Sequence, residues 1–228
     1  MNSDLGELSA DEVQAIQEMR RKRQQQRVAT KIKFPEILIP SIEDVSAIAL
    51  QYNKHITGLR PGQYECIADL LQQKDVLAII PTGGGKSLIW LIPAIIIQRV
   101  QSVQYSPLPL VVVIVPFLAT MESHLANFMK WGLAASSNES LEVLRTKITN
   151  CCWMYCTPEK FVRNEMFRTL IMGQSYRIRY VVYDEAHEYL VAWREDILKC
   201  PGLVSEMLPN ATIFTAVTNE RQIVGLAA

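Results

Sequence analysis

The chain has 228 residues, of which 49% are hydrophobic and 20% are charged. This length and composition allow one sizeable core with an appendage, so we expect a single main domain. The formal net charge is zero, which excludes a globally basic surface and restricts any nucleic-acid contact to local patches. The amino terminus is acidic and polar, and prolines interrupt the longest apolar stretches. We therefore expect a soluble, intracellular protein without a signal peptide or a membrane partner.

Residues 1–55 are interpreted as an N-terminal helical extension with a linker. Ser9 can cap a helix that runs to about Arg27, because Glu12 follows three positions later and apolar residues recur at helical spacing. The second half of this helix reads R-R-K-R-Q-Q-Q-R. This run is a nuclear-import signal, an arm for nucleic acid, or the solvated end of a helix, and we prefer the last interpretation. A nuclear location would apply only in a eukaryote. Ser41–Tyr52 predicts a second short helix.

Residues 56–228 show strands that alternate with helices. The strands are short and almost wholly apolar, which is typical of a parallel sheet with helices on both faces. The pattern predicts an α/β fold with a doubly wound parallel sheet. The predicted strands are Asp75–Ile80, Leu110–Val115, Cys151–Cys156, Tyr180–Tyr183 and Thr212–Ala216.

A glycine-rich segment, P-T-G-G-G-K-S, joins the first strand to an apolar helix. Glycines let consecutive N–H groups point inward at phosphate oxygens, and the helix adds its positive N-terminal dipole. Lys86 would reach the β- and γ-phosphates, and the Ser87 hydroxyl would bind Mg²⁺. An ordinary glycine turn is the alternative, and the P-loop pattern departs at Ile80, where a glycine is usual. The predicted nucleotide-binding residues are Pro81, Thr82, Gly83, Gly84, Gly85, Lys86 and Ser87.

The strand Tyr180–Tyr183 ends in the acidic segment D-E-A-H. Asp184 is the candidate partner for a nucleotide-bound Mg²⁺ ion. Glu185 is the candidate carboxylate that orients and deprotonates an attacking water. His187 can connect the nucleotide site to a polynucleotide site through hydrogen bonds. The alternative is an exposed charged turn, but a parallel sheet can bring this strand end to the glycine-rich loop.

The cysteines do not show the spacing of a zinc site. Cys151, Cys152 and Cys156 could hold a metal only with a fourth ligand from elsewhere. Their aromatic and apolar neighbours favour a buried strand that carries reduced thiols, because free cysteine packs as a small hydrophobe.

These motifs, together with L-R-P-G-Q at Leu59–Gln63, resemble a superfamily 2 helicase of the RecQ-like type. The resemblance implies a P-loop NTPase fold with the first RecA-like domain, and ATP and Mg²⁺ as cofactors. It implies that Gln63 reads the adenine edge and that Arg60 packs on the base. A hydrophobic residue at the Ile80 position is also usual in that family. The implied function is ATP hydrolysis coupled to 3′ to 5′ DNA unwinding, in recombination and repair.

Two further segments resemble polynucleotide-contacting motifs of that family. They read V-P-F-L-A-T-M from Val115 and C-T-P-E-K from Cys156. The resemblance implies that Pro116, Thr157 and Lys160 face single-stranded or partially duplex DNA, with RNA left open. By itself, T-P-E-K predicts a helix that begins with a threonine cap and a proline. Lys160 is then either a phosphate ligand or a solvated lysine.

Two segments depart from the RecQ pattern. The segment after D-E-A-H reads E-Y-L-V-A-W-R-E-D-I, which has one added residue and lacks the histidine and phenylalanine of the family's coupling loop. Trp193 and Asp196 are its nearest counterparts, and Trp193 either stacks on a base or packs within the loop. Thr215–Thr218 reads T-A-V-T, where the family has a T-A-T-A-like sequence. Coupling between DNA contact and ATP hydrolysis is thereby in question.

Helicases of this superfamily bind ATP between two RecA-like domains, and the second supplies arginine fingers. We expect no second RecA-like domain in this sequence, so the chain alone should bind ATP weakly, hydrolyse it very slowly and not unwind DNA. A second helicase domain or a protein partner would act in trans. The alternative function is a nucleic-acid- or partner-binding module that keeps the fold without unwinding. A small-molecule kinase is disfavoured, because L-R-P-G-Q and D-E-A-H have no purpose there.

Overall fold

A computed structural model of the chain describes residues 34, 36–52, 58–81, 83–101, 108–128, 134–189 and 195–217. The predicted helix from Ser9 to Arg27 lies outside these residues, as do Thr82, Trp193 and Thr218. The described residues contain no helix with the length and apolar character needed to cross a membrane.

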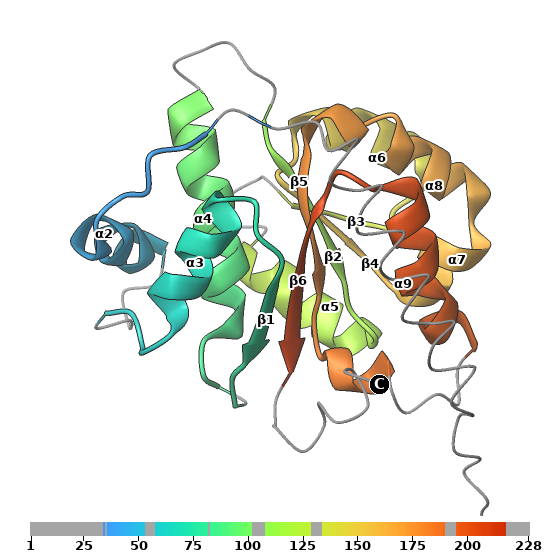
Figure 1. The fold of residues 1–228 in the computed structure, drawn as a ribbon. Helices are drawn as coiled ribbons and strands as arrows, with labels where there is room; N and C mark the ends of the chain where they lie inside the picture. The colour runs from blue at the N-terminus through green and yellow to red at the C-terminus, as the bar shows by residue number, and fades with distance from the viewer. Residues whose placement is uncertain are drawn as a thin grey trace, which may run out of the picture.

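Six parallel strands of the described residues form one sheet in the order β1-β6-β5-β2-β4-β3 (Figure 1). Five of them confirm the predicted strands, and the doubly wound parallel α/β fold is also confirmed. The sequence pattern missed β3, because three residues of alanine and serine form no β-branched run. The strands are β1 (Val76–Ile79), β2 (Leu110–Ile114), β3 (Ala134–Ser136), β4 (Trp153–Cys156), β5 (Ile178–Tyr183) and β6 (Thr212–Val217).

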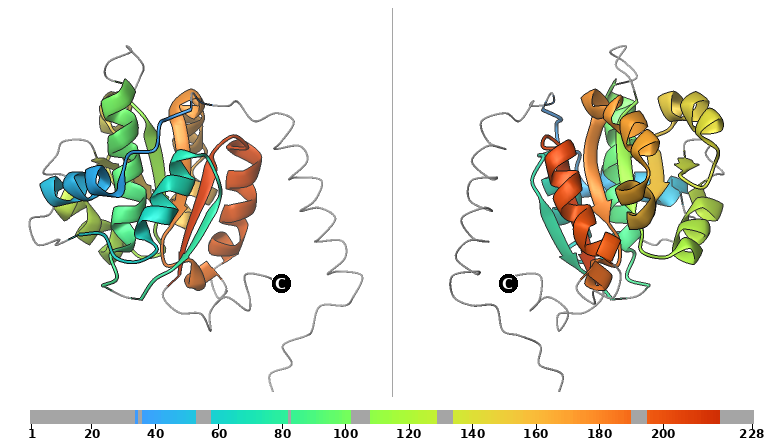
Figure 2. Two further views of the ribbon diagram at one scale, coloured as in Figure 1. Left: turned by 60° about the vertical axis from the view of Figure 1, so that its left-hand side comes forward. Right: turned by 90° about the vertical axis from the view of Figure 1, so that its right-hand side faces the viewer.

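Helices cover both faces of the sheet (Figures 1 and 2). One face carries α2 (Ile42–Tyr52), α3 (Gln63–Leu71), α4 (Lys86–Gln101) and α5 (Leu118–Phe128). The other carries α6 (Leu141–Lys147), α7 (Pro158–Arg163), α8 (Glu165–Met172) and α9 (Glu195–Met207). All side chains of β2, β4 and β5 are buried, because helices exclude water from both sides. This double burial explains why the strands read as continuous apolar runs.

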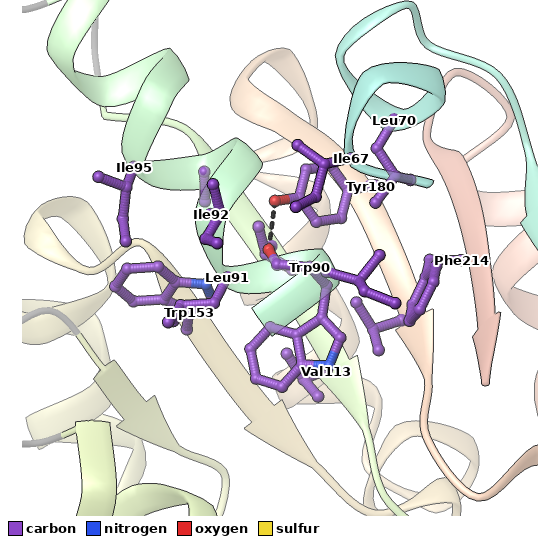
Figure 3. Packing of buried hydrophobic residues seen from close by; sticks show 14 of the residues in the cluster. Ile67, Leu70, Trp90, Leu91, Ile92, Ile95, Val113, Trp153, Tyr180 and Phe214 are labelled. Carbon is purple, nitrogen blue, oxygen red and sulfur yellow. Dashed lines mark hydrogen bonds between the residues drawn. The ribbon is translucent and has the colours of Figure 1, made fainter. Parts of the chain in front are cut away.

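The core between the sheet and α4 contains large aromatic side chains. Trp90, Trp153 and Tyr180 are almost wholly buried there (Figure 3). The Tyr180 hydroxyl donates a hydrogen bond of 2.5 Å to the main-chain oxygen of Trp90. This bond connects β5, which ends in the acidic segment, to α4, which follows the glycine-rich loop.

Helix α2 belongs to the same core, although its sequence lies in the predicted extension. Val45 and Ala49 of α2 are fully buried in the cluster that contains the α4 residues. The helix begins as predicted, because the Ser41 hydroxyl oxygen accepts the Asp44 main-chain N–H at 3.1 Å. Residues 53–57, where the predicted extension meets the main domain, are outside the described residues.

A buried arginine connects strands at the amino ends of the sheet. Arg177 is 2% exposed, and its guanidinium donates to the main-chain oxygens of Leu108 (2.8 Å), Cys151 (3.0 Å) and Ile148. Its Nε also donates to the Gln174 side chain at 2.7 Å. These bonds satisfy backbone oxygens of the segments that precede β2 and β4.

The cysteine cluster packs as the strand interpretation predicted. Cys151, Cys152 and Cys156 are buried free thiols, and burial raises the pKa of Cys151 to about 11 and that of Cys152 to about 12. Thiols with such pKa values stay protonated and behave as small apolar groups at neutral pH.

Candidate functional site

The carboxyl ends of the parallel strands bring the glycine-rich loop and the acidic segment together. The loop follows β1, the acidic segment follows β5, and β6 lies between them. Lys86 Nζ donates to Glu185 Oε1 at 2.7 Å across 99 residues of sequence. The Lys86 side chain is 9% exposed and that of Glu185 is 24% exposed, so the ion pair is largely shielded from water. The predicted convergence of the two motifs is therefore present.

The loop after β1 has the backbone that a phosphate cradle requires. Gly83 and Gly85 have φ angles of 74° and 84°. Residues that carry a side chain adopt such angles only with strain. A Cβ on Gly84 would lie 2.3 Å from Ile80 Cγ2 and 2.7 Å from the Pro81 oxygen, so the loop is too tight for a side chain there. Helix α4 begins directly afterwards at Lys86 and directs its N-terminal dipole at the loop.

The L-R-P-G-Q segment braces this loop. Gln63 is 2% exposed, and its Nε2 donates to the main-chain oxygens of Gly84 and Gly85 at 3.2 and 3.1 Å. Its Oε1 accepts the Arg60 main-chain N–H at 2.7 Å. The Arg60 guanidinium donates to the Gly83 oxygen at 2.7 Å. Both residues thus contact the loop, and their implied contacts with adenine stay a prediction.

The strand end at Asp184 turns sharply. Glu185 has a φ of 48°, a left-handed conformation that is uncommon for a residue with a side chain. In this turn Asp184 Oδ1 accepts the Glu185 main-chain N–H at 3.0 Å. Asp184 is 3% exposed, and this burial raises the pKa of its carboxyl group, with His124 and Lys86 acting in the opposite direction. His187 lies in the 3-10 helix η4 (Ala186–Tyr189), but its side chain is not among the described ones.

The sequence interpretation missed His124, which lies beside the acidic segment. Its Nε2 is 3.7 Å from Asp184 Oδ2. Burial lowers the pKa of His124, although Asp184 and Glu185 partly oppose this shift. A histidine in the middle of a helix gives no local signal of such a contact, because it depends on how α5 packs on the sheet.

The predicted polynucleotide-contacting residues lie at the same edge of the sheet. Pro116 follows β2 and Thr157 follows β4, and the Val115 N–H donates to the Cys156 oxygen at 3.0 Å. Thr157 caps α7 as predicted, since its hydroxyl oxygen accepts the Lys160 N–H at 3.3 Å. Lys160 lies in the first turn of α7 and is partly exposed. DNA contact by these residues stays a prediction.

Helix α9, which begins within the coupling segment, forms an ion pair with α7. Asp196 in the first turn of α9 is 7% exposed, and its Oδ2 lies 2.5 Å from Arg163 Nη2 of α7. The T-A-V segment of β6 lies between β1 and β5, with Thr215 beside Tyr183 and Val217 beside Ile79. It therefore separates the two halves of the candidate site by one strand.

The sequence model of the DEAD/DEAH box helicase family matches residues 60–228. This chain belongs to the DEAD/DEAH box helicase family. The match begins at Arg60 and includes the glycine-rich loop, the acidic segment and β6.

Two similar proteins are ATP-dependent DNA helicases. The chain is 28% identical over 170 residues to ATP-dependent DNA helicase Q1 of Rattus norvegicus, an alignment that covers 68% of this chain and 26% of that protein. It is 29% identical over 194 residues to ATP-dependent DNA helicase Q-like 4B of Arabidopsis thaliana, covering 75% of this chain and 16% of that protein. The chain thus spans about a quarter or less of the length of these relatives.

Solved helicase structures share the fold. The DUF1998 helicase MrfA bound to DNA superposes with a TM-score of 0.63 at 15% identity, covering 86% of this chain and 29% of that chain. The DEAD-box helicase Mss116 bound to ssRNA and UDP-BeF superposes with a TM-score of 0.55 at 16% identity, covering 82% and 41%. These likenesses establish the RecA-like α/β architecture of this DEAD/DEAH box family member.

Proposed function

We propose that this chain is the ATP-binding motor domain of a RecQ-like DNA helicase, which binds Mg²⁺-ATP at the carboxyl ends of β1 and β5. The contact between Lys86 and Glu185 is the observation that carries this proposal. It joins the cation expected to bind phosphate to the carboxylate expected to activate water. The similarity to ATP-dependent DNA helicases supports DNA as the polynucleotide.

The residues at this edge fit a magnesium-bound triphosphate. Magnesium bound to a nucleotide needs only one or two protein ligands, because phosphates and waters fill the other positions. Ser87 at the start of α4 and Asp184 at the end of β5 would hold the ion. When bound, the ion would neutralise charge on the phosphate oxygens.

Each residue of the site has a role that follows from its position. The N–H groups of the loop and of the first turn of α4 would bind phosphate oxygens. Lys86 would pair with the terminal phosphates, and Glu185 would accept a proton from the attacking water. Gln63 would keep the loop in its cradle shape through the bonds to Gly84 and Gly85.

The ion pair between Lys86 and Glu185 suggests how the base becomes available. While Lys86 pairs with Glu185, the ammonium occupies the carboxylate oxygen that would accept a proton. A triphosphate competes for the ammonium with a larger negative charge. Transfer of Lys86 to phosphate would release Glu185 only when substrate is present, which limits unproductive proton transfer.

Nucleotide binding by the purified 228-residue chain tests the proposal. We expect a fluorescent ATP analogue to bind in the presence of Mg²⁺ and to be displaced by excess ATP. We also expect single-stranded DNA to raise a slow ATPase rate, with no separation of a DNA duplex by the chain alone. A chain that binds no nucleotide at any Mg²⁺ concentration contradicts the proposal. Strand separation by the chain alone contradicts the need for a second domain in trans.

A methyl group on Gly85 should disrupt the nucleotide site. The change Gly85→Ala places a Cβ 2.5 Å from Gln63 Nε2 at a φ of 84°. The left-handed conformation costs a non-glycine residue about 1–2 kcal/mol, which corresponds to roughly tenfold weaker nucleotide binding if the loop must keep this shape. Titration with the fluorescent analogue measures the loss.

Gly202→Ala is the matched control for this change. A Cβ at Gly202 in α9 meets nothing within 4 Å, so nucleotide affinity should not change. Alanine in a helix should instead stabilise the fold by about 0.5–1 kcal/mol. Equal nucleotide affinity of Gly85→Ala and the unchanged chain would show that this loop conformation is not used for binding.

A non-unwinding polynucleotide-binding module is the second candidate function. The coupling segment Glu188–Ile197 lacks the histidine and phenylalanine that RecQ enzymes have there, and this departure favours the second candidate. The two functions differ in one result, because a module of this kind would bind DNA with no effect on its ATPase rate. DNA-stimulated hydrolysis that is lost on Lys86→Ala would rule it out.

A further inference from the structure

We infer that His124 is a positioning residue, which orients the Asp184 carboxylate for Mg²⁺ and connects it to the helix that begins at the polynucleotide-facing edge. This inference rests on the proposed function. It concerns a residue outside the glycine-rich loop and the acidic segment, on an element that neither motif contains.

The two oxygens of Asp184 have separate partners. Oδ1 accepts the Glu185 main-chain N–H at 3.0 Å, and Oδ2 faces His124 Nε2 at 3.7 Å. The first contact is a hydrogen bond, whereas the second exceeds hydrogen-bond length by less than 1 Å. The imidazole ring is therefore placed to orient this carboxylate once a small movement brings Nε2 within hydrogen-bond length of Oδ2.

The ring of His124 forms a cluster with two aromatic side chains. Its centroid lies 6.0 Å from that of Trp90 on α4 and 6.0 Å from that of Tyr155 on β4. Trp90 and Tyr155 also contact each other, with centroids 6.1 Å apart at an interplanar angle of 69°. Both are fully buried, so the ring has little freedom to turn away from Asp184.

The same cluster extends to the hydroxyl of Tyr155. Burial raises the pKa of Tyr155 well above its usual value, and the charge of Asp184 contributes to the rise. Asp184 therefore lies within electrostatic range of the Tyr155 hydroxyl as well as of the His124 ring. Such outer contacts commonly fix the direction of a carboxylate that binds a metal.

Helix α5 gives His124 a second connection. The helix starts at Leu118, directly after Pro116 and Phe117, at the edge where polynucleotide is expected. Phe117 and Leu118 are 41% and 52% exposed, whereas His124 points into the protein. A shift of α5 on DNA contact would carry the His124 backbone with it and so change the distance from the ring to Asp184.

The Mg²⁺ dependence of nucleotide binding tests this role. The Mg²⁺ concentration that gives half-maximal binding of the fluorescent ATP analogue is measured for the unchanged chain and for His124→Ala, His124→Phe and His124→Gln. We expect His124→Ala and His124→Phe to raise this concentration roughly tenfold, as loss of an outer partner of a metal ligand does. Binding measured with EDTA should not change.

The three substitutions separate positioning from packing. Phenylalanine keeps a ring between Trp90 and Tyr155 but has no N–H, whereas glutamine has an N–H donor of similar reach. We expect His124→Gln to restore the Mg²⁺ dependence to within about threefold of the unchanged chain, because a hydrogen-bonding partner of the metal ligand is retained. Glu122→Ala, at an exposed position of the same helix, is the control and should change nothing. Circular dichroism checks that each variant is folded.

Several outcomes would overturn the inference. A normal Mg²⁺ dependence in His124→Phe would show that the ring acts only by packing. A His124→Gln protein as defective as His124→Phe would show that an N–H donor at position 124 does not support Mg²⁺ binding. If His124→Ala does not fold, the phenylalanine and glutamine variants still decide. If the unchanged chain binds no nucleotide, the proposed function fails and this inference fails with it.

Discussion

Replacement of Lys86 by alanine is expected to weaken binding of Mg²⁺-ATP by about 10- to 100-fold, the value of a charge-assisted hydrogen bond. The ammonium is 9% exposed and lies at the first residue of α4, directly after the glycine-rich loop. A cation held there acts on phosphate with little screening by water. Titration with a fluorescent ATP analogue gives the affinity, and the DNA-stimulated ATPase rate should fall with it.

The change also removes the partner of Glu185, so folding must be measured beside binding. Lys74→Ala is a matched control, because Lys74 Nζ forms an ion pair with Asp69 at 2.9 Å, with side chains 59% and 44% exposed. Its loss should alter stability by less than about 1 kcal/mol and leave nucleotide binding intact. A Lys86→Ala protein that is folded and binds Mg²⁺-ATP normally would remove the basis of the proposed function.

Replacement of Arg177 by methionine is expected to reduce the free energy of unfolding by about 3 kcal/mol or more, because it leaves buried oxygens unsatisfied. The guanidinium donates to the main-chain oxygens of Leu108, Cys151 and Ile148. Methionine fills a similar volume but donates no hydrogen bond. Arg177→Lys should recover only part of the loss, since an ammonium lacks the planar fork that reaches several oxygens.

Urea denaturation measures this effect through the transition midpoint and slope. Arg145→Met provides the comparison, because Arg145 is exposed on α6, and should shift stability by no more than about 0.5 kcal/mol. Identical midpoints for Arg177→Met and the unchanged chain would mean that water or a rearranged loop satisfies these oxygens.

Much of the fold was predictable because the strands of a buried parallel sheet have a recognisable apolar sequence pattern. The buried strands β2, β4 and β5 need apolar, mostly β-branched or aromatic residues on both faces, and these runs are visible without a structure. Strand β3 was not predictable, since Ala134–Ser136 is too short and too small in side-chain volume to indicate a strand. Its pairing with β4 decides its conformation.

The candidate site was also predictable only in part. The glycine-rich loop and the acidic strand end were recognisable because phosphate binding and metal binding require particular residues at adjacent positions. The distance between Lys86 and Glu185 could be anticipated only as a consequence of strand order. The bracing of the loop by Gln63 was missed, because the donors and acceptors lie about twenty residues apart.

The sequence by itself determined the parallel α/β architecture, the position of the glycine-rich loop and the position of the acidic pair, because each depends on short contiguous patterns with a local physical requirement. Only the tertiary structure decided that His124 faces Asp184 and that Arg177 joins the starts of the strands. A histidine on a helix or an arginine before a strand has many possible neighbours. The packing of helices on the sheet selects among them, and that packing sums many weak contacts between residues far apart in the chain.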